Sequence, residues 1–346
     1  MLRSTRPVTP LLQIRPADRM NNLSAQILCR LATSGDFLSG EELCREFGVT
    51  RSAVWKHIRL LRSEGYQLDA VTGRGYRLTA LTGRAVSAEV EPFLSTRCFG
   101  RNLFYHETTD STNLQAKALA VRGSVEGTVV AADSQTGGRG RMGRSWNSPA
   151  GKNLYFTLIL RPEVPSLRVP QLTLLVAVAL HRALVRFVPD LQPKIKWPND
   201  ILVNEKKICG VLCEMQSEPD CTHFVVVGLG INVNQSEFPA ELEGRATSLF
   251  LECGRSFSKP ELLAAFLNQF EPLYDRWLIE EDLGFVLSYI EGHSLLQSRV
   301  VMVEQFNRTI SGTVSGIAKG GELMLEGDDG GTVLVSSGEA HLSKRH

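Results

Sequence analysis

The sequence predicts an α+β protein built from three modules, and three patterns along the chain predict it. Short helices followed by a hairpin occupy residues 22–80, helices mixed with hairpin-linked strands fill the middle, and the C-terminal part alternates apolar and polar residues between Gly-rich turns. A chain of 346 residues is long enough for two or three domains. We expect a flexible leader over 1–19, a winged helix-turn-helix over 20–82, a central domain over 83–296 and an SH3-like β-barrel over 297–346.

The composition is that of an ordinary globular protein, with 43% hydrophobic and 22% charged residues. It argues against a disordered, collagen-like or membrane-embedded chain. Lys and Arg number 38 against 37 Asp and Glu, a formal net charge of +1, so the chain as a whole is not a bulk polyanion binder. Any nucleic-acid binding must therefore come from positive charge that is concentrated locally.

The sequence indicates a cytoplasmic protein without a structural metal. The seven cysteines are scattered, lack the paired spacing of a zinc site, and indicate free thiols in a reducing compartment. The most apolar stretch, Leu172–Val188, is interrupted by a histidine and two arginines, and we expect it to be too polar and too short to cross a bilayer. The leader is basic, but its prolines disfavour the amphipathic helix of a transit peptide, and Met20 opens the first periodic segment.

The N-terminal module begins with three short helices. The apolar stripe of the first helix consists of Ala25, Ile27, Leu28 and Leu31. Ser39 and Glu42 fit a capping box at the start of the second helix, which ends where Gly48 supplies a turn. Thr50 then caps a third helix over about Arg51–Arg62. A helix, a glycine-containing turn and another helix form the outline of a helix-turn-helix.

The third helix separates a core face from a basic face. Val54, Ile58 and Leu61 repeat at the spacing of a core face. The helix also carries four basic residues and no acidic one: Arg51, Lys56, Arg59 and Arg62. Such a face is often simply solvated, but two short strands joined by a Gly-Arg-Gly tip follow it and form a basic wing. The pattern therefore favours DNA binding, through Thr50, Arg51, Ser52, Trp55, Lys56, Arg59 and Arg74.

The central module mixes helices with strands joined by hairpins, which favours an α+β domain over a doubly wound sheet. Helices are expected at Ser87–Leu94, Ser111–Val121, Pro170–Phe187 and Ser258–Leu278. Strands are expected at Leu103–Glu107, Thr128–Ala132, Leu154–Leu160, Lys194–Lys196, Ile201–Val203, Ile208–Met215 and Phe224–Val227. In the C-terminal module they are expected at Val300–Glu304, Thr309–Ser315, Glu322–Leu325 and Thr332–Val335.

A polar loop over 133–152 contains the most unusual stretch of the chain. Gly138, Gly140 and Gly143 match the G-x-G-x-x-G pattern of dinucleotide-binding proteins. That pattern requires a helix directly after the glycines, and here an aromatic-rich strand follows, so a Rossmann site is not expected. The loop instead offers glycine backbone and three arginines as ligands for phosphate and carboxylate oxygens: Arg139, Arg141 and Arg144.

Three further polar clusters lie in the same module. They are Asp110-Ser111-Thr112-Asn113, Lys196-Trp197-Pro198-Asn199-Asp200 and Gly228-Leu229-Gly230-Ile231-Asn232-Val233-Asn234. Each one alone has a plain structural interpretation, as a helix cap, a solvated strand end or a close approach of backbone. Four such clusters in one module exceed coincidence and indicate a shared site.

Together with Lys207-Ile208-Cys209-Gly210-Val211-Leu212-Cys213-Glu214, these motifs stand in the order typical of biotin–protein ligases, which the chain resembles over roughly residues 22–345. With its winged helix, the chain resembles the bifunctional kind, which is both a biotin ligase and a repressor of the biotin operon. The resemblance implies a central mixed sheet of the class II synthetase type. It also implies that ATP activates biotin to biotinyl-5'-AMP and that the biotinyl group passes to a lysine of the biotin carboxyl carrier protein of acetyl-CoA carboxylase.

The resemblance implies roles for individual residues as well. Biotin binding falls to Ser111, Thr112, Asn113, Gln135, Arg139, Gly140, Arg141 and Lys196. Nucleotide binding falls to Arg139, Arg141, Trp146, Lys196 and Asn232, and we expect Lys196 and Arg141 to be catalytic. The expected cofactors are ATP, biotin and Mg²⁺, with no metal ligand assigned. The expected partners are the carrier protein, operator DNA and a second copy of the chain when the adenylate is bound, with no membrane.

Two other functions stay open at this point. A non-catalytic, biotin-sensing repressor would need no ligands for an α-phosphate, so the set of Arg139, Arg141 and Lys196 argues against it. A lipoate-type ligase shares the chemistry of adenylation, but the winged helix and the arginine loop are typical of the biotin ligases. An assay of biotin transfer to a carrier domain distinguishes the bifunctional ligase from the non-catalytic repressor.

Overall fold

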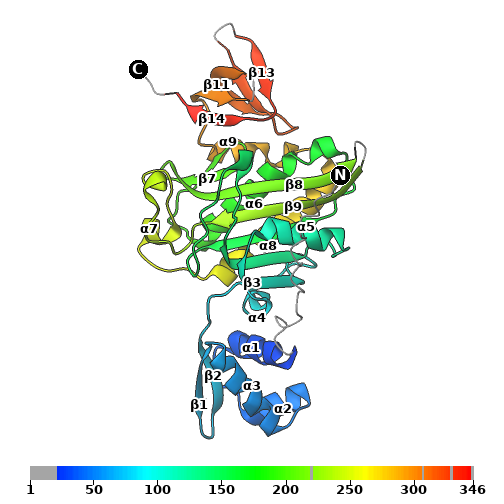
Figure 1. The fold of residues 1–346 in the computed structure, drawn as a ribbon, viewed down its shortest axis with the longest axis vertical. Coiled ribbons are helices and arrows are strands. Elements are labelled where there is room, and N and C mark those ends of the chain that lie inside the picture. Colours follow the sequence, from blue (N-terminus) through cyan, green and yellow to red (C-terminus); the bar gives the residue numbers. More distant parts are fainter. Residues whose placement is uncertain (1–21, 219–220, 306–307, 328–329, 344–346) are drawn as a thin grey trace, which may run out of the picture. The chain divides into compact units, whose positions relative to one another are not determined.

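The computed structural model describes residues 22–218, 221–305, 308–327 and 330–343 (Figure 1). The chain divides into two compact units, Met1–Thr79 and Ala80–His346. The leader expected over 1–19 lies outside the described residues.

The N-terminal unit has three helices and a two-stranded sheet. Its elements are α1 (Asn22–Ser34), α2 (Gly40–Phe47), α3 (Arg51–Ser63), β1 (Gln67–Val71) and β2 (Gly75–Ala80). The predicted capping box is confirmed, because Ser39 Oγ accepts from the Glu42 amide at 3.0 Å and the Glu42 carboxylate accepts from the Ser39 amide at 3.1 Å. Gly48 ends α2 in the left-handed region with a φ of 64°. The predicted winged helix-turn-helix is therefore confirmed.

The wing of this unit is joined to the segment before α2 by backbone. Leu38 and Tyr76 exchange two N–H···O bonds, both 2.8 Å long, so Leu38 acts as a short third strand. Gly75 lies at this junction with a φ of 104°. A Cβ atom there would lie 2.6 Å from the Leu38 carbonyl carbon and would overlap its oxygen. Only glycine fits this position, because both the backbone conformation and the space exclude a side chain.

The second unit is built on a seven-stranded mixed sheet in the order β3-β4-β5-β9-β8-β7-β6. Its strands are β3 (Leu103–Thr109), β4 (Val129–Gln135), β5 (Leu154–Leu160), β6 (Lys194–Lys196), β7 (Asp200–Val203), β8 (Lys206–Glu218) and β9 (Cys221–Ile231). β3 and β4 are parallel, and the other neighbouring pairs are antiparallel. The predicted α+β class is confirmed.

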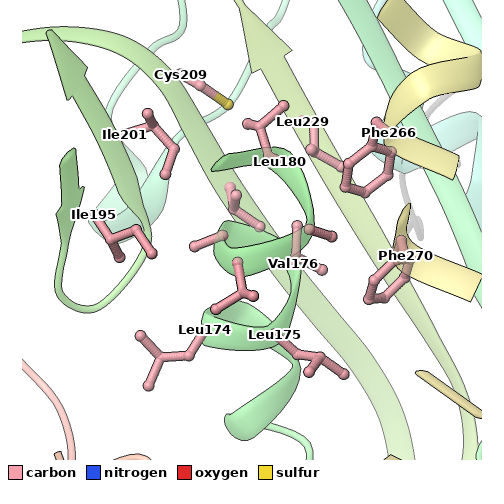
Figure 2. Close-up of a cluster of buried hydrophobic side chains, with 14 of the residues drawn as sticks. Leu174, Leu175, Val176, Leu180, Ile195, Ile201, Cys209, Leu229, Phe266 and Phe270 are labelled. Atoms are coloured by element: carbon pink, nitrogen blue, oxygen red, sulfur yellow. The ribbon is translucent and has the colours of Figure 1, made fainter. Parts of the chain in front are cut away.

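Helices cover both faces of this sheet. They are α4 (Ser87–Val90), α5 (Thr112–Val121), α6 (Gln171–Phe187), α7 (Leu249–Cys253), α8 (Lys259–Glu280) and α9 (Leu287–His293). Short 3-10 turns lie at Glu91–Phe93, Arg141–Gly143, Ser166–Arg168, Ala240–Leu242 and Gly284–Val286. α5 packs on one face, against Val130, Ile159 and Val226. On the other face, α6 packs against α8, with Val176 and Leu180 near Leu229 and Phe266 (Figure 2). α8 also contacts the sheet directly, because the ring centre of Phe266 lies 5.5 Å from that of Phe156 in β5.

α6 corrects one expectation about length. Together with the preceding 3-10 turn it forms a helical stretch over Ser166–Phe187, 22 residues, which is long and apolar enough to cross a membrane by length and composition. The expectation that this stretch is too short is therefore wrong, because the turn before the helix extends it. However, 72% of its apolar window is buried inside the protein, as in the core helix of a globular domain.

The C-terminal part of the second unit is an antiparallel sheet in the order β13-β12-β11-β10-β14. Its strands are β10 (Val300–Glu304), β11 (Thr309–Ile317), β12 (Leu323–Glu326), β13 (Thr332–Val335) and β14 (Glu339–Leu342). Buried residues of this sheet, such as Val301, Val314 and Leu325, belong to the same hydrophobic cluster as α6 and α8. The sheet therefore shares a core with the rest of the unit.

Several element boundaries differ from the prediction, most of all that of β9, and three elements were not expected. β9 spans eleven residues rather than Phe224–Val227, because its glycines interrupt the apolar pattern while leaving the backbone extended. α7, α9 and β14 were not expected at all; each is short, and none carries a strong periodic signal.

Gly75→Ala is expected to lower the free energy of unfolding of the N-terminal unit by more than about 2 kcal/mol, because the new Cβ is strained and overlaps Leu38. The matched control is Gly73→Ala, where φ is 82° but nothing lies within 4 Å of the Cβ position. That control is expected to cost about 1 kcal/mol from the backbone conformation alone. Urea unfolding of both variants measures the difference, and equal losses would contradict the close approach.

Candidate functional site

One cavity of about 470 Å³ in the second unit brings the predicted site residues together. Its lining comes from the start of α5, the end of β4, the arginine loop, the turn between β6 and β7, and the glycines of β8 and β9. All the residues that the resemblance implied for biotin and nucleotide line it: Ser111, Thr112, Asn113, Gln135, Arg139, Gly140, Arg141, Trp146, Lys196 and Asn232. Glu339 and His341 of the C-terminal sheet line it as well.

The arginine loop forms a tight hairpin over this cavity. Gly140 donates its amide to the Arg144 carbonyl at 2.7 Å, and Trp146 donates to the Gly138 carbonyl at 2.9 Å. At the tip, Met142 adopts a left-handed φ of 54°. The element that follows the loop is β5 and no helix opens there, in agreement with the exclusion of a Rossmann site.

Arg141 points from the loop to two neutral oxygens. Its guanidinium donates to Asn199 Oδ1 at 3.0 Å and to the Gly338 carbonyl at 3.4 Å. Burial lowers the pKa of Arg141, but a guanidinium stays protonated at neutral pH. Because both acceptors are uncharged, the positive charge of this side chain is not neutralised by either of them and can serve an anionic ligand.

Arg144 is engaged differently, in a forked pair with Glu339. One guanidinium nitrogen lies 2.9 Å from Glu339 Oε1, and the other contacts Oε2. Hydrogen bonds from Arg144 hold the pKa of Glu339 below its ordinary value, and the charge of nearby Lys196 acts in the same direction. The pair ties the loop to the C-terminal sheet, and the cavity is also lined by Arg139, Arg141, Lys196, Lys207 and Arg245.

Trp146 lies on a floor made of two glycines that face each other across β8 and β9. Gly210 and Gly230 are register partners, and a Cβ on either would come within 3 Å of the indole ring. The Lys207 ammonium lies 5.4 Å from the ring centre and pairs with Asp200 at 2.8 Å. The indole Nε1 is buried against Gly230 and has no hydrogen-bond partner among the described residues.

Asn232 is held in position by a hydrogen bond within the protein. It is buried and its amide donates to the Thr247 carbonyl at 3.0 Å.

Four residues at the site were not predicted as candidates from the sequence: Thr157, Asn199, Glu214 and Glu339. Two of them stand inside the quoted motifs, and Thr157 is a polar residue in the middle of an apolar strand, which is a usable signal. Glu339 has no local signal.

The described residues contain no group of three or more His, Cys, Asp or Glu side chains that could hold a metal ion. Mg²⁺ commonly keeps its waters and binds through substrate phosphates plus one or two carboxylates. Asp200, which lines the cavity and pairs with Lys207, is a carboxylate that fits that pattern.

The N-terminal unit presents part of the predicted basic surface on α3. Trp55 is 53% exposed, and the Arg59 guanidinium lies 4.7 Å from its ring centre. Arg74 in the wing lies 4.3 Å from the Phe37 ring centre. Arg62 differs from the expectation, because at the last turn of the helix it donates to the Leu68 carbonyl at 2.6 Å and fastens β1 to α3.

Comparison with known families and proteins gives consistent matches over both units. A model described as the biotin/lipoate A/B protein ligase family matches residues 105–232, and an HTH domain model matches residues 24–77. The bifunctional ligase/repressor BirA of Bacillus subtilis (strain 168) is 40% identical over 297 residues, which cover 85% of this chain and 91% of that protein.

Two further matches concern the second unit in particular. The biotin–[acetyl-CoA-carboxylase] ligase of Paracoccus denitrificans is 34% identical over 236 residues, 66% of this chain and 96% of that protein. The solved structure of the biotin protein ligase from Aquifex aeolicus in complex with biotin and ATP has a TM-score of 0.61 and 31% identity, and the match covers 71% of this chain and 100% of that one.

Gly230→Ala is expected to displace Trp146 and loosen the arginine loop, because the new Cβ would overlap the indole. Limited trypsin digestion, mapped by mass spectrometry, should show cleavage within Arg139–Arg144 about tenfold faster, which corresponds to about 1.4 kcal/mol in loop opening. Gly292→Ala in α9 is the matched control, since nothing lies within 4 Å of its Cβ position. Unchanged cleavage in the Gly230 variant would contradict this seating of Trp146.

Proposed function

The chain belongs to the family of bifunctional ligase/repressors, and we propose that it joins biotin to its carrier protein through the cavity described above. It is a biotin–[acetyl-CoA-carboxylase] ligase with an N-terminal repressor module. Biotin is activated with ATP to biotinyl-5'-AMP, and a lysine of the biotin carboxyl carrier protein then receives the biotinyl group. The observation that carries this assignment is the convergence of Arg139, Arg141 and Lys196 on one cavity.

The charge of the cavity suits the first step. A carboxylate oxygen of biotin attacks the α-phosphorus of ATP, the bond to the bridging oxygen breaks, and pyrophosphate leaves. Two anions must therefore approach each other, and fixed cations are the groups that stabilise the charge of such a transition state. Arg141 and Lys196 are assigned to the α-phosphate and to the biotin carboxylate. Mg²⁺, when bound, would neutralise charge on the departing phosphates, and Asp200, which lines the cavity, is assigned to hold it.

The second step needs protection from water more than it needs an acid–base pair. The lysine amine of the carrier attacks the acyl carbon of the mixed anhydride, AMP leaves, and the amine loses a proton to solvent. Water can attack the same carbon and destroy the intermediate. The arginine loop, seated through Trp146 on Gly210 and Gly230, is assigned to cover the adenylate until the carrier arrives.

The N-terminal unit is assigned to operator DNA, with α3 in the major groove and the wing on the phosphate backbone. Thr50, Ser52, Trp55, Lys56 and Arg59 are the residues assigned to this contact, together with Arg51 and Arg74. A dimer of adenylate-bound chains, each on one half-site, completes the repressor in the cytoplasm.

Lys196→Ala is expected to reduce biotin-dependent ATP–pyrophosphate exchange by about 10²-fold or more, because a fixed cation at the reacting phosphate is lost. Arg141→Ala is expected either to do the same or to release biotinyl-5'-AMP into solution, which chromatography of the reaction detects. Arg276→Gln, in an exposed pair with Glu280, is the matched control. Exchange and adenylate retention like those of the unaltered chain would remove both residues from these roles, and lipoate in place of biotin tests the lipoate-type alternative.

Lys56→Ala is expected to weaken operator binding and to reduce the slope of log K against log salt by about 1, as for the loss of one phosphate contact. Arg30→Ala is the control within the same unit, since Arg30 pairs with Glu46 at 3.0 Å. Fluorescence anisotropy with labelled operator across a salt series measures both. Salt-independent binding, or none with biotin and ATP present, would contradict the repressor role.

A further inference from the structure

Asn113 lines the cavity, but both the oxygen and the nitrogen of its side-chain amide are hydrogen-bonded within the protein. Thr157 Oγ1 donates to Asn113 Oδ1 at 2.7 Å, and Asn113 Nδ2 donates to Glu214 Oε2 at 2.8 Å. A carboxylate can only accept, so the atom facing Glu214 must be the NH₂ group and the oxygen must face Thr157. The second hydrogen of the amide lies toward the Leu212 carbonyl, at 3.4 Å. Little hydrogen-bonding capacity is left for a ligand.

The amide crosses three neighbouring strands of the sheet. Thr157 is fully buried in β5, Glu214 lies in β8, and Gly228 of β9 lies between them in the sheet order. A Cβ at Gly228 would come within 2.8 Å of Asn113 Cγ, so the amide rests directly on the β9 backbone. Asn113 therefore fastens the start of α5 to the centre of the sheet.

Glu214 binds two side chains of α5 that lie one helical turn apart. Besides Asn113 it binds Lys117, whose ammonium lies 2.5 Å from Oε1, and these two residues stand at i and i+4 of the helix. Although burial opposes it, hydrogen bonds from Lys117 and Asn113 keep the pKa of Glu214 below its ordinary value. Glu214 is therefore a carboxylate at neutral pH and an acceptor for both side chains.

The first turn of α5 carries the groups that remain for a ligand. Thr112, which precedes Asn113, donates its backbone N–H to Gln135 Oε1 at 2.9 Å. This hydrogen bond holds Thr112 in place as well. Ser111, the N-cap, is buried and lines the cavity, and its hydroxyl makes no capping bond to the helix. The position of this hydroxyl is thus set by the anchored residues that follow it.

We propose that Glu214 and Thr157 are positioning residues for the acid substrate, and that Asn113 does not itself contact that substrate. Glu214 acts through Asn113, whereas Thr157 acts through Asn113 and through Thr112, whose hydroxyl oxygen lies 2.9 Å from Thr157 Oγ1. The inference rests on the proposed function for the identity of the acid, biotin. It revises the role that the resemblance implied for Asn113 and adds two residues to the site. The effect is expected mainly on the acid side of the cavity, because the side-chain hydrogen bonds of Asn113 run to Thr157, Leu212 and Glu214 and do not include the arginine loop's contacts with Asn199 and Glu339.

The test is an exchange of charge between the two partners. Asn113→Asp places two carboxylates against each other and is expected to raise KM for biotin about tenfold or more, with KM for ATP within about twofold. Adding Glu214→Gln restores a pair of one carboxylate and one amide, in which the amide at position 214 now donates to the carboxylate at position 113. This double variant is expected to return KM for biotin to within about threefold of the unaltered chain. Glu214→Gln alone completes the cycle, and Arg276→Gln serves as the control.

If Asn113 touched biotin through its NH₂ group, the defect of Asn113→Asp would persist in the double variant, and that result overturns the proposal. Should the single variant fail to fold, Thr157→Val keeps the test open: it removes the buried hydroxyl at nearly constant volume, and an unchanged KM for biotin overturns the proposal.

Thermal unfolding of the same four proteins separates the two levels of inference. Absence of exchange activity in the unaltered chain refutes the proposed function. The anchoring of Asn113 by Glu214 and Thr157 is then judged only by the unfolding temperatures of the four proteins. The double variant is expected to be more stable than the sum of the single changes predicts. If the effects of Asn113→Asp and Glu214→Gln on thermal unfolding and on KM for biotin are additive, the anchoring of Asn113 by Glu214 is overturned, even in a chain that ligates biotin.

Discussion

Cations gathered in one cavity repel one another, and the rest of the second unit is arranged to hold them there. Two of these cations have different kinds of partner. Arg144 has a carboxylate, Glu339, whereas Arg141 is held by an amide oxygen and a backbone carbonyl. A neutral acceptor fixes the geometry of a guanidinium without neutralising its charge, so the field of Arg141 stays available for an incoming anion.

The order of strands in the sheet explains why these side chains meet. β9 lies between β5 and β8, so a floor of small residues runs across the middle of the sheet, where Gly210, Gly228 and Gly230 leave room for Asn113 and Trp146. The start of α5 is anchored at one end of this floor and the arginine loop at the other. Asn113 and Trp146 thus have separate supports within a single cavity, and the proposed role of Glu214 concerns the support of Asn113.

Much of the fold could be predicted because its signals are local. The capping box at Ser39, the turn at Gly48 and the alternation in β10 each lie within a few residues, and each was confirmed. What the sequence could not provide were pairings over long separations. Thr157 and Glu214 are 44 and 101 residues from Asn113, and no local pattern reports such a contact. The full length of β9 was missed because the glycines that make the floor also weaken the strand pattern.

The shared core of the second unit has a consequence for how such a chain can be shortened. The first unit is compact by itself and can be gained or lost at the Thr79–Ala80 boundary without opening the core of the second. Loss of the final strand, β14, is different in kind: it removes Ala340 from the cluster that contains Phe266 and Leu180, it leaves Val301 without its strand partner Leu342, and it removes Glu339 from Arg144. A stop codon before β14 therefore yields an exposed apolar surface and a misfolding-prone chain, whereas a late start codon near residue 80 yields a self-contained ligase body.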